Sequence, residues 1–160
     1  MAAPLTRELV IATARAQLER GESAQLSLRG VARELDVTAP ALYLYVKDKR
    51  DLLAGVAEEH FEALLTRFEA AEDPDPLQWI RNLSRAYIDH ARSSPALFPL
   101  LFRYPPTPVP DADVFAPAAR AFEMAARATA AAIDAGILVV DDPADRKSTR
   151  LNSSHTQKSR

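Results

Sequence analysis

Residues 38–53, TAPALYLYVKDKRDLL, carry the side chains with the clearest chemistry in the chain. Tyr43 and Tyr45 are followed closely by the cations Lys47, Lys49 and Arg50. Hydroxyl, ammonium and guanidinium groups all donate hydrogen bonds to phosphate oxygens. The segment therefore favours a surface that binds a polyanion. A simpler interpretation stays open, in which the rings pack in the core and the charges are only solvated.

Helical signals lie on both sides of this segment. Thr6 is a suitable cap for a first helix over residues 6–20, with Gly21 just past its end. Ser27 is a suitable cap for a second, short helix, and Thr38 for a third over residues 38–46. The expected buried stripe of the first helix consists of Val10, Ile11, Ala14 and Leu18, and that of the second of Leu28, Val31, Ala32 and Leu35.

A long fourth helix is expected from the cap Asp48 to about residue 71, with Asp51 as a box-like partner of the cap. Asp75 and Pro76 predict the start of a fifth helix. A sixth follows the SSP at 93–95, and a seventh runs over about 114–135 and ends at Gly136. Between the last two lies a proline-rich connector, YPPTPVPDAD. A new cap at Asp142 and Pro143 predicts that another helix should follow.

Composition points to an all-α protein, since glycines number only four among the 160 residues. There is no cysteine, so disulfides and thiolate metal sites are excluded, and the three histidines do not cluster. Charge is uneven: residues 1–50 carry eight Lys/Arg against six Asp/Glu, a balance of +2, whereas residues 51–145 carry seven against sixteen, a balance of −9. A mildly basic head on an acidic body fits a protein that presents one end to a polyanion. No signal peptide or membrane-spanning run is evident, so we expect a cytoplasmic protein.

Two short helices joined by a tight turn and packed on a preceding helix are typical of a helix-turn-helix. The stretch LSLRGVARELDVTAPALYLYVKDKRDLL resembles the DNA-binding domain of the tetracycline repressor (TetR) family. The positions that match the family pattern are Ser27, Thr38, Leu42-Tyr43, Tyr45-Val46 and Lys49. The resemblance implies a DNA-binding domain over residues 5–65, with its motif at about 27–46.

The resemblance also implies which residues meet DNA. Phosphate contacts would come from the first turn of the third helix, its tyrosine and the following lysine, and a base contact from the second helix. The candidate DNA-binding residues are Ser27, Arg29, Thr38, Ala39, Tyr43, Tyr45 and Lys49. Alternatives stay open: Tyr43 as core, Tyr45 and Val46 as packing, Arg29 paired with Glu34 or solvated, and Lys47 and Arg50 as solvated surface.

The recognition helix departs from the family pattern in one respect. Positions that often carry polar side chains are Ala39, Ala41 and Leu44 here, which can touch thymine methyl groups but cannot form hydrogen bonds with bases. Base readout would then fall on Arg29, Thr38 and DNA shape.

Residues 75–144 resemble the family's variable regulatory domain in helical layout. The resemblance implies that this domain binds an unknown small-molecule effector and that the intact protein is a homodimer on a palindromic operator. Aromatic and amphipathic groups that could line a pocket are Trp79, Tyr87, His90, Phe98 and Phe102; ordinary core is the alternative for each. No cofactor is expected, and we find no metal-ligand spacing.

The segment DRKSTRLNSSHTQKSR at residues 145–160 breaks from the preceding pattern. Its first part back-translates to a sequence that resembles a common short-read sequencing adapter, so we expect a non-native tail; a natural disordered basic tail is the alternative. Family members dimerise through C-terminal helices that would follow residue 144. We therefore expect impaired dimerisation of this chain.

The sequence thus predicts a DNA-binding transcriptional regulator, a ligand-released repressor by resemblance. An enzyme is disfavoured because no phosphate loop, metal-ligand spacing or nucleophile elbow is present. A helical small-molecule carrier or protein-interaction module without DNA binding is the remaining alternative.

Overall fold

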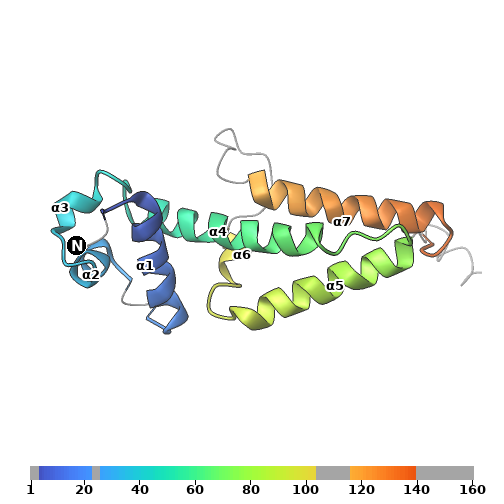
Figure 1. Ribbon diagram of the computed structural model, residues 1–160, viewed down its shortest axis with the longest axis horizontal. Coiled ribbons are helices and arrows are strands. Elements are labelled where there is room, and N and C mark those ends of the chain that lie inside the picture. Colours follow the sequence, from blue (N-terminus) through green and yellow to red (C-terminus); the bar gives the residue numbers. More distant parts are fainter. Residues whose placement is uncertain (1–3, 23–25, 104–115, 140–160) are drawn as a thin grey trace, which may run out of the picture.

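The computed structural model describes residues 4–22, 26–103 and 116–139, and all regular secondary structure within them is helical. The all-α prediction is therefore confirmed. The helices, shown in Figure 1, are α1 (Arg7–Glu19), α2 (Leu28–Glu34), α3 (Ala39–Leu42), α4 (Lys49–Glu69), α5 (Pro76–Ser93), α6 (Leu100–Arg103) and α7 (Ala116–Asp134).

Local capping determines where most of these helices begin. The Thr6 hydroxyl accepts a hydrogen bond from the Leu9 N–H at 3.2 Å, and the Ser27 hydroxyl accepts one from the Gly30 N–H at 3.1 Å. Asp48 and Asp75 cap α4 and α5 in the same way. These four predicted caps are confirmed, because each satisfies N–H groups that have no partner within the helix.

The third helix is shorter than the sequence predicts. It ends at Leu42, and the N–H groups of residues 43, 44 and 45 then bond to carbonyls three residues back, at 2.9 to 3.4 Å. The chain continues as a tighter helical turn up to Val46. Thr38 occupies the cap position, but its side chain makes no cap hydrogen bond. The prediction of an α-helix over 38–46 is therefore wrong in its second half, and the predicted Thr38 cap bond is absent.

One hydrophobic core holds the N-terminal helices together. The stripe predicted for α1 is fully buried, whereas in α2 Val31 and Ala32 are buried and Leu28 and Leu35 are only half-buried. Leu42, Val46 and Leu52 join this core from α3, the α3–α4 connection (residues 43–48) and α4. Leu97 and Leu100, far along the chain, also pack here.

A second core lies between α4, α5 and α7. Figure 1 shows α5 and α7 on either side of the C-terminal part of α4, while α2 and α3 lie at the opposite end of the molecule. The first core includes Val56 and Ala57, and the second begins at Phe61, so the 21-residue α4 passes through both. A helix of this length extends about 30 Å, which rigidly connects the two ends.

The C-terminal predictions are confirmed only where the structure describes the chain. α7 ends close to the predicted position, and Gly136 after it has a φ of +69°, as a glycine that terminates a helix commonly does. The proline-rich connector, the expected helix after Asp142 and the expected foreign tail lie outside the described residues. Within the described residues, no helix is long and apolar enough to span a bilayer.

Candidate nucleic-acid interface and C-terminal cavity

Exposed cations without acidic partners gather at the end of the molecule that contains α2 and α3. These cations are Arg29 and Arg33 of α2, Lys47 of the α3–α4 connection, and Lys49 and Arg50 of α4. None of them makes an ion pair with any residue in the described part of the chain. By contrast, the two arginines of α1, Arg7 and Arg15, and Arg20 at its C-cap are paired with carboxylates. Five exposed cations without an ion-pair partner among the described residues are therefore grouped at this end.

The alternative pairing of Arg29 with Glu34 is wrong. Glu34 instead accepts hydrogen bonds from Arg20 at 2.9 Å and from Gln17 at 2.7 Å, and these lower the pKa of its carboxyl. Glu34 is thereby tied to α1, and Arg29 is left exposed on α2. Its guanidinium remains available to an external acceptor.

The side chains after α3 differ sharply in exposure. Tyr43 is 59% exposed and Leu44 is 82% exposed, so the interpretation of Tyr43 as core is wrong. Tyr45 is half-buried against the first core, and Val46 is buried, as the packing interpretation has it.

The other candidate DNA-binding residues lie nearby. Thr38 is exposed, whereas Ala39 is half-buried and packs on the first core. Ser27 is half-buried, and its oxygen is engaged in the cap of α2. Thr38, Tyr43 and Lys49 thus present polar groups to solvent from three successive parts of the chain.

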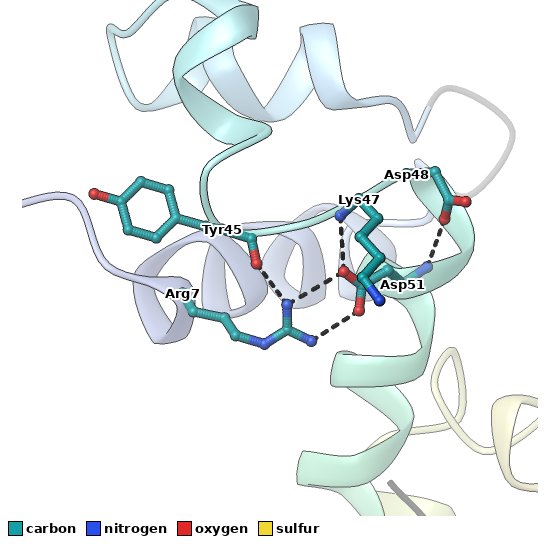
Figure 2. A network of polar contacts seen from close by, with 5 residues as sticks. All are labelled: Arg7, Tyr45, Lys47, Asp48 and Asp51. Carbon is teal, nitrogen blue, oxygen red and sulfur yellow. Dashed lines mark hydrogen bonds and ion pairs between the residues drawn. The ribbon is translucent and has the colours of Figure 1, made fainter. Parts of the chain in front are cut away.

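A polar network of Arg7 from α1 and Asp51 from α4 holds the α3–α4 connection in place (Figure 2). Arg7 donates to the Tyr45 carbonyl at 2.6 Å and to the two Asp51 carboxylate oxygens at 2.9 and 3.4 Å. Asp51 also accepts a hydrogen bond from the Lys47 N–H at 2.8 Å. The Arg7 guanidinium holds the pKa of the Asp51 carboxyl below its usual value. The capping-box partner predicted for Asp51 is wrong: its carboxylate accepts a hydrogen bond from the Lys47 N–H and not from the N–H of the cap Asp48.

An apolar cavity of about 650 Å³ opens between α4, α5, α6 and α7. Its inner wall includes Phe61, Leu64 and Leu83, which are buried, and its rim includes Tyr87, Ile88, Phe102 and Phe122, which are exposed. Among the described residues, no charged side chain lines it; the polar groups of its lining side chains are the hydroxyls of Ser84 and Tyr87. Such a cavity suits an uncharged, largely apolar molecule.

Only two of the five candidate ligand residues line this cavity, Tyr87 and Phe102. Phe98 packs edge-to-face between those two rings, at centroid distances of 5.4 and 5.3 Å, and is not part of the lining. Trp79 lies in the second core with the Arg127 guanidinium 5.6 Å from its ring centroid. Ile88 and Phe122, which also line the cavity, were not predicted from the sequence, because their only signal was an apolar side chain off the buried stripe of a helix.

His90 also lies outside the cavity lining, because it stacks on His60. The ring centroids are 4.0 Å apart, both residues are buried, and neither Nε2 has a hydrogen-bond partner in the described part of the chain. Burial, together with the nearby His90 and Arg67, lowers the pKa of His60 to about 4, and burial also lowers the pKa of His90. Within the described residues, no three His, Asp or Glu side chains are grouped as metal ligands.

Comparison with known proteins identifies relatives of both the C-terminal region and the whole fold. Residues 80–154 match the family model described as "Tetracyclin repressor-like, C-terminal domain". The match includes residues 145–154 and does not test whether they are foreign. No curated protein matches the sequence significantly.

Two solved structures share the fold. One is a protein of unknown function from Rhodococcus sp. RHA1, with 25% identity and a TM-score of 0.72 over 88% of this chain and 74% of that chain. The other is the TetR family transcriptional regulator PfmR from Thermus thermophilus, with 20% identity and a TM-score of 0.63 over 88% of this chain and 77% of that chain. Residues 80–154 thus resemble the C-terminal domain of tetracycline repressor (TetR)-like proteins, and the chain shares its helical fold with a TetR family transcriptional regulator.

Proposed function

We propose that this protein binds DNA sequence-specifically through the end that contains α2, α3 and the start of α4. The observation that carries the proposal is the group of exposed cations without acidic partners beside the exposed Tyr43 and Leu44. Fixed positive charge beside hydroxyl donors is the composition of a phosphate-binding surface.

In this proposal the segment from Thr38 to Leu44 enters the major groove. The hydroxyls of Thr38 and Tyr43 and the ammonium of Lys49 contact phosphates, and Arg29 reads a base edge, with guanine as its best partner. Ala39 and Leu44 supply apolar contacts to thymine methyl groups. Ser27 and Tyr45 contribute mainly through the backbone they fix, since one caps α2 and the other is half-buried.

The cavity gives the same chain a means of control. An uncharged apolar effector bound between α4 and α7 would shift α4, whose first residues include Lys49, and so alter the grip on DNA. We propose that the protein acts in the cytoplasm as a homodimeric, ligand-released repressor on a palindromic operator, without enzymatic activity. Two half-sites bound together would supply the affinity that one cannot.

A small-molecule carrier without DNA binding is the second candidate, and the same cavity supports it. A carrier does not need the exposed cations. Substitution of one of them should therefore weaken DNA binding if the first function is correct and have no effect on ligand binding by a carrier.

Lys49→Ala is the test, with Arg81→Ala as its matched control. Arg81 is an exposed cation on α5 that makes no ion pair with a described residue. Fluorescence anisotropy should show that Lys49→Ala weakens binding to all DNA sequences and lowers the salt slope by about one, since one phosphate contact is lost. Arg81→Ala should bind like the wild type. Equal affinities and slopes for Lys49→Ala and the wild type would contradict the proposed interface.

A further inference from the structure

We infer that Arg7 is a positioning residue for DNA binding, which holds the phosphate-contacting segment 43–49 in place without touching DNA itself. This inference rests on the proposed function. It concerns a side chain outside the helix-turn-helix, at the first position of α1.

The guanidinium joins two points that lie on either side of the segment's cations. Its Nη1 donates to the Tyr45 carbonyl at 2.6 Å, just after α3, and its Nη2 donates to Asp51 at 2.9 Å, in the first turn of α4. Asp51 in turn accepts from the Lys47 N–H at 2.8 Å. The α3–α4 connection is thus held to α1 through the Tyr45 carbonyl and to the first turn of α4 through the Lys47 N–H (Figure 2).

Apart from Arg7 and Asp51, no described side chain makes a hydrogen bond to the backbone of residues 43–48. The Tyr45 carbonyl lies just beyond α3 and accepts from Arg7, and Lys47 N–H donates only to Asp51 among the described residues. A planar fork of N–H donors can serve a carbonyl and a carboxylate together, whereas an ammonium group at the same position lacks that geometry. Loss of Arg7 would therefore release the backbone of the α3–α4 connection, which sets the distance between Tyr43 and Lys49.

The guanidinium is already engaged, which argues against a phosphate contact of its own. Both of its Nη atoms donate within the protein, and the Asp51 carboxylate neutralises its charge. The helix contact beneath it is also close: a Cβ on Gly55 would lie 2.5 Å from Ile11 Cδ1 and 3.7 Å from Arg7 Nη2. A methyl group at position 55 would therefore require the Ile11 side chain to shift.

Arg15 provides a matched control. It also lies on α1 and pairs with a carboxylate of α4, Glu59, at 3.6 Å. That pair is two helical turns away from the Arg7 pair and makes no hydrogen bond to the α3–α4 connection. Removal of Arg15 therefore deletes an ion pair between the same two helices and leaves the segment 43–49 tied down.

The experiment compares Arg7→Ala, Arg7→Lys, Asp51→Asn and Arg15→Ala with the wild type. DNA affinity is measured by anisotropy over a series of salt concentrations, at a temperature where thermal melts show every variant folded. We expect Arg7→Ala to weaken DNA binding about tenfold with an unchanged salt slope, and Arg7→Lys to give little rescue. Asp51→Asn should weaken binding, and the double variant should be no weaker than Arg7→Ala. Arg15→Ala should stay near the wild type.

Three results would overturn the inference. Equal losses for Arg7→Ala and Arg15→Ala would indicate a general effect of the α1–α4 contact. A salt slope lowered by about one in Arg7→Ala, as expected for Lys49→Ala, would make Arg7 a direct phosphate contact. Wild-type affinity in Arg7→Ala would remove the positioning role while the proposed function stands.

Amide hydrogen exchange separates this inference from the proposed function. We expect the Lys47 N–H to exchange faster in Arg7→Ala than in Arg15→Ala, in the absence of DNA. Failure of the wild type to bind DNA would reject the proposed function and with it the DNA-positioning role. Unchanged exchange at Lys47 would reject the positioning role whatever the wild type binds.

Discussion

At the residue scale, the stacked pair of His60 and His90 has a consequence for stability. Both rings are buried at the level where the two cores meet along α4, and Arg67 is the nearby positive charge. An imidazolium there would lose hydration and face another cation. Burial therefore favours the neutral form of both rings in the folded state.

The pH dependence of stability should follow from His60. Its pKa is about 4 in the folded protein and close to 6.5 in the unfolded chain, so the unfolded state takes up the proton first as pH falls. The free energy of unfolding should decrease between about pH 6.5 and about pH 4, by up to about 1.4 kcal/mol per pH unit from this group. Urea titrations at several pH values measure it.

His60→Phe is the matched variant, because it keeps an aromatic ring and removes the titrating group. The difference in unfolding free energy between wild type and variant should change with pH in that window, which cancels contributions from carboxylates. A difference that stays constant with pH would contradict the account.

The helix caps and the contacts of Arg7 differ in whether the sequence alone could predict them. The caps at Thr6, Ser27, Asp48 and Asp75 were predictable, because each contact spans two or three residues. The contacts of Arg7 span 38 and 44 residues, so they depend on how α1 packs, which local patterns do not encode.

At the element scale, the four helices α4 to α7 together create the cavity. α7 contributes alanines, Ala118, Ala121 and Ala125, whose small side chains leave the space open. Aromatic residues around α5 and α6 were expected to line a pocket; Tyr87 and Phe102 do so, whereas Trp79 is buried in the second core. Which face of α5 meets α7 depends on the packing angle and not on periodicity alone.

Ala121→Trp should fill the cavity and block an apolar ligand. The neutral probe N-phenyl-1-naphthylamine should fluoresce more strongly with the wild type, and Ala121→Trp should abolish most of that increase. Ala130→Trp places the same side chain on an exposed position of α7 and serves as control. Equal enhancement in the two variants would show that the probe binds elsewhere.

The shortness of α3 is also an effect of elements on one another. Periodicity predicted a helix up to residue 46, and Leu42 and Val46, which are four residues apart, are both buried in the first core. The N–H groups of residues 43–45 nevertheless bond three residues back, and Tyr43 and Leu44 lie outside that core. The sequence therefore predicted two short helices and the Ser27 cap of α2, but not the turn geometry that exposes Tyr43 and Leu44.

At the scale of the whole molecule, the helices α2 and α3 lie at one end of the long axis, and α5 and α7 extend to the other (Figure 1). The exposed cations of α2, the α3–α4 connection and the start of α4 lie at the first end, where the proposed function requires a polyanion to bind. The α4 helix links this end to the cavity, which is what control by an effector requires.

The most direct test of DNA recognition is fluorescence anisotropy of the protein on DNA from upstream of its own gene, at two salt concentrations, with random DNA as competitor. The account predicts tight binding that weakens as salt increases and that random DNA displaces poorly. Absence of binding, or equal binding to any sequence, would contradict it and would favour the small-molecule carrier.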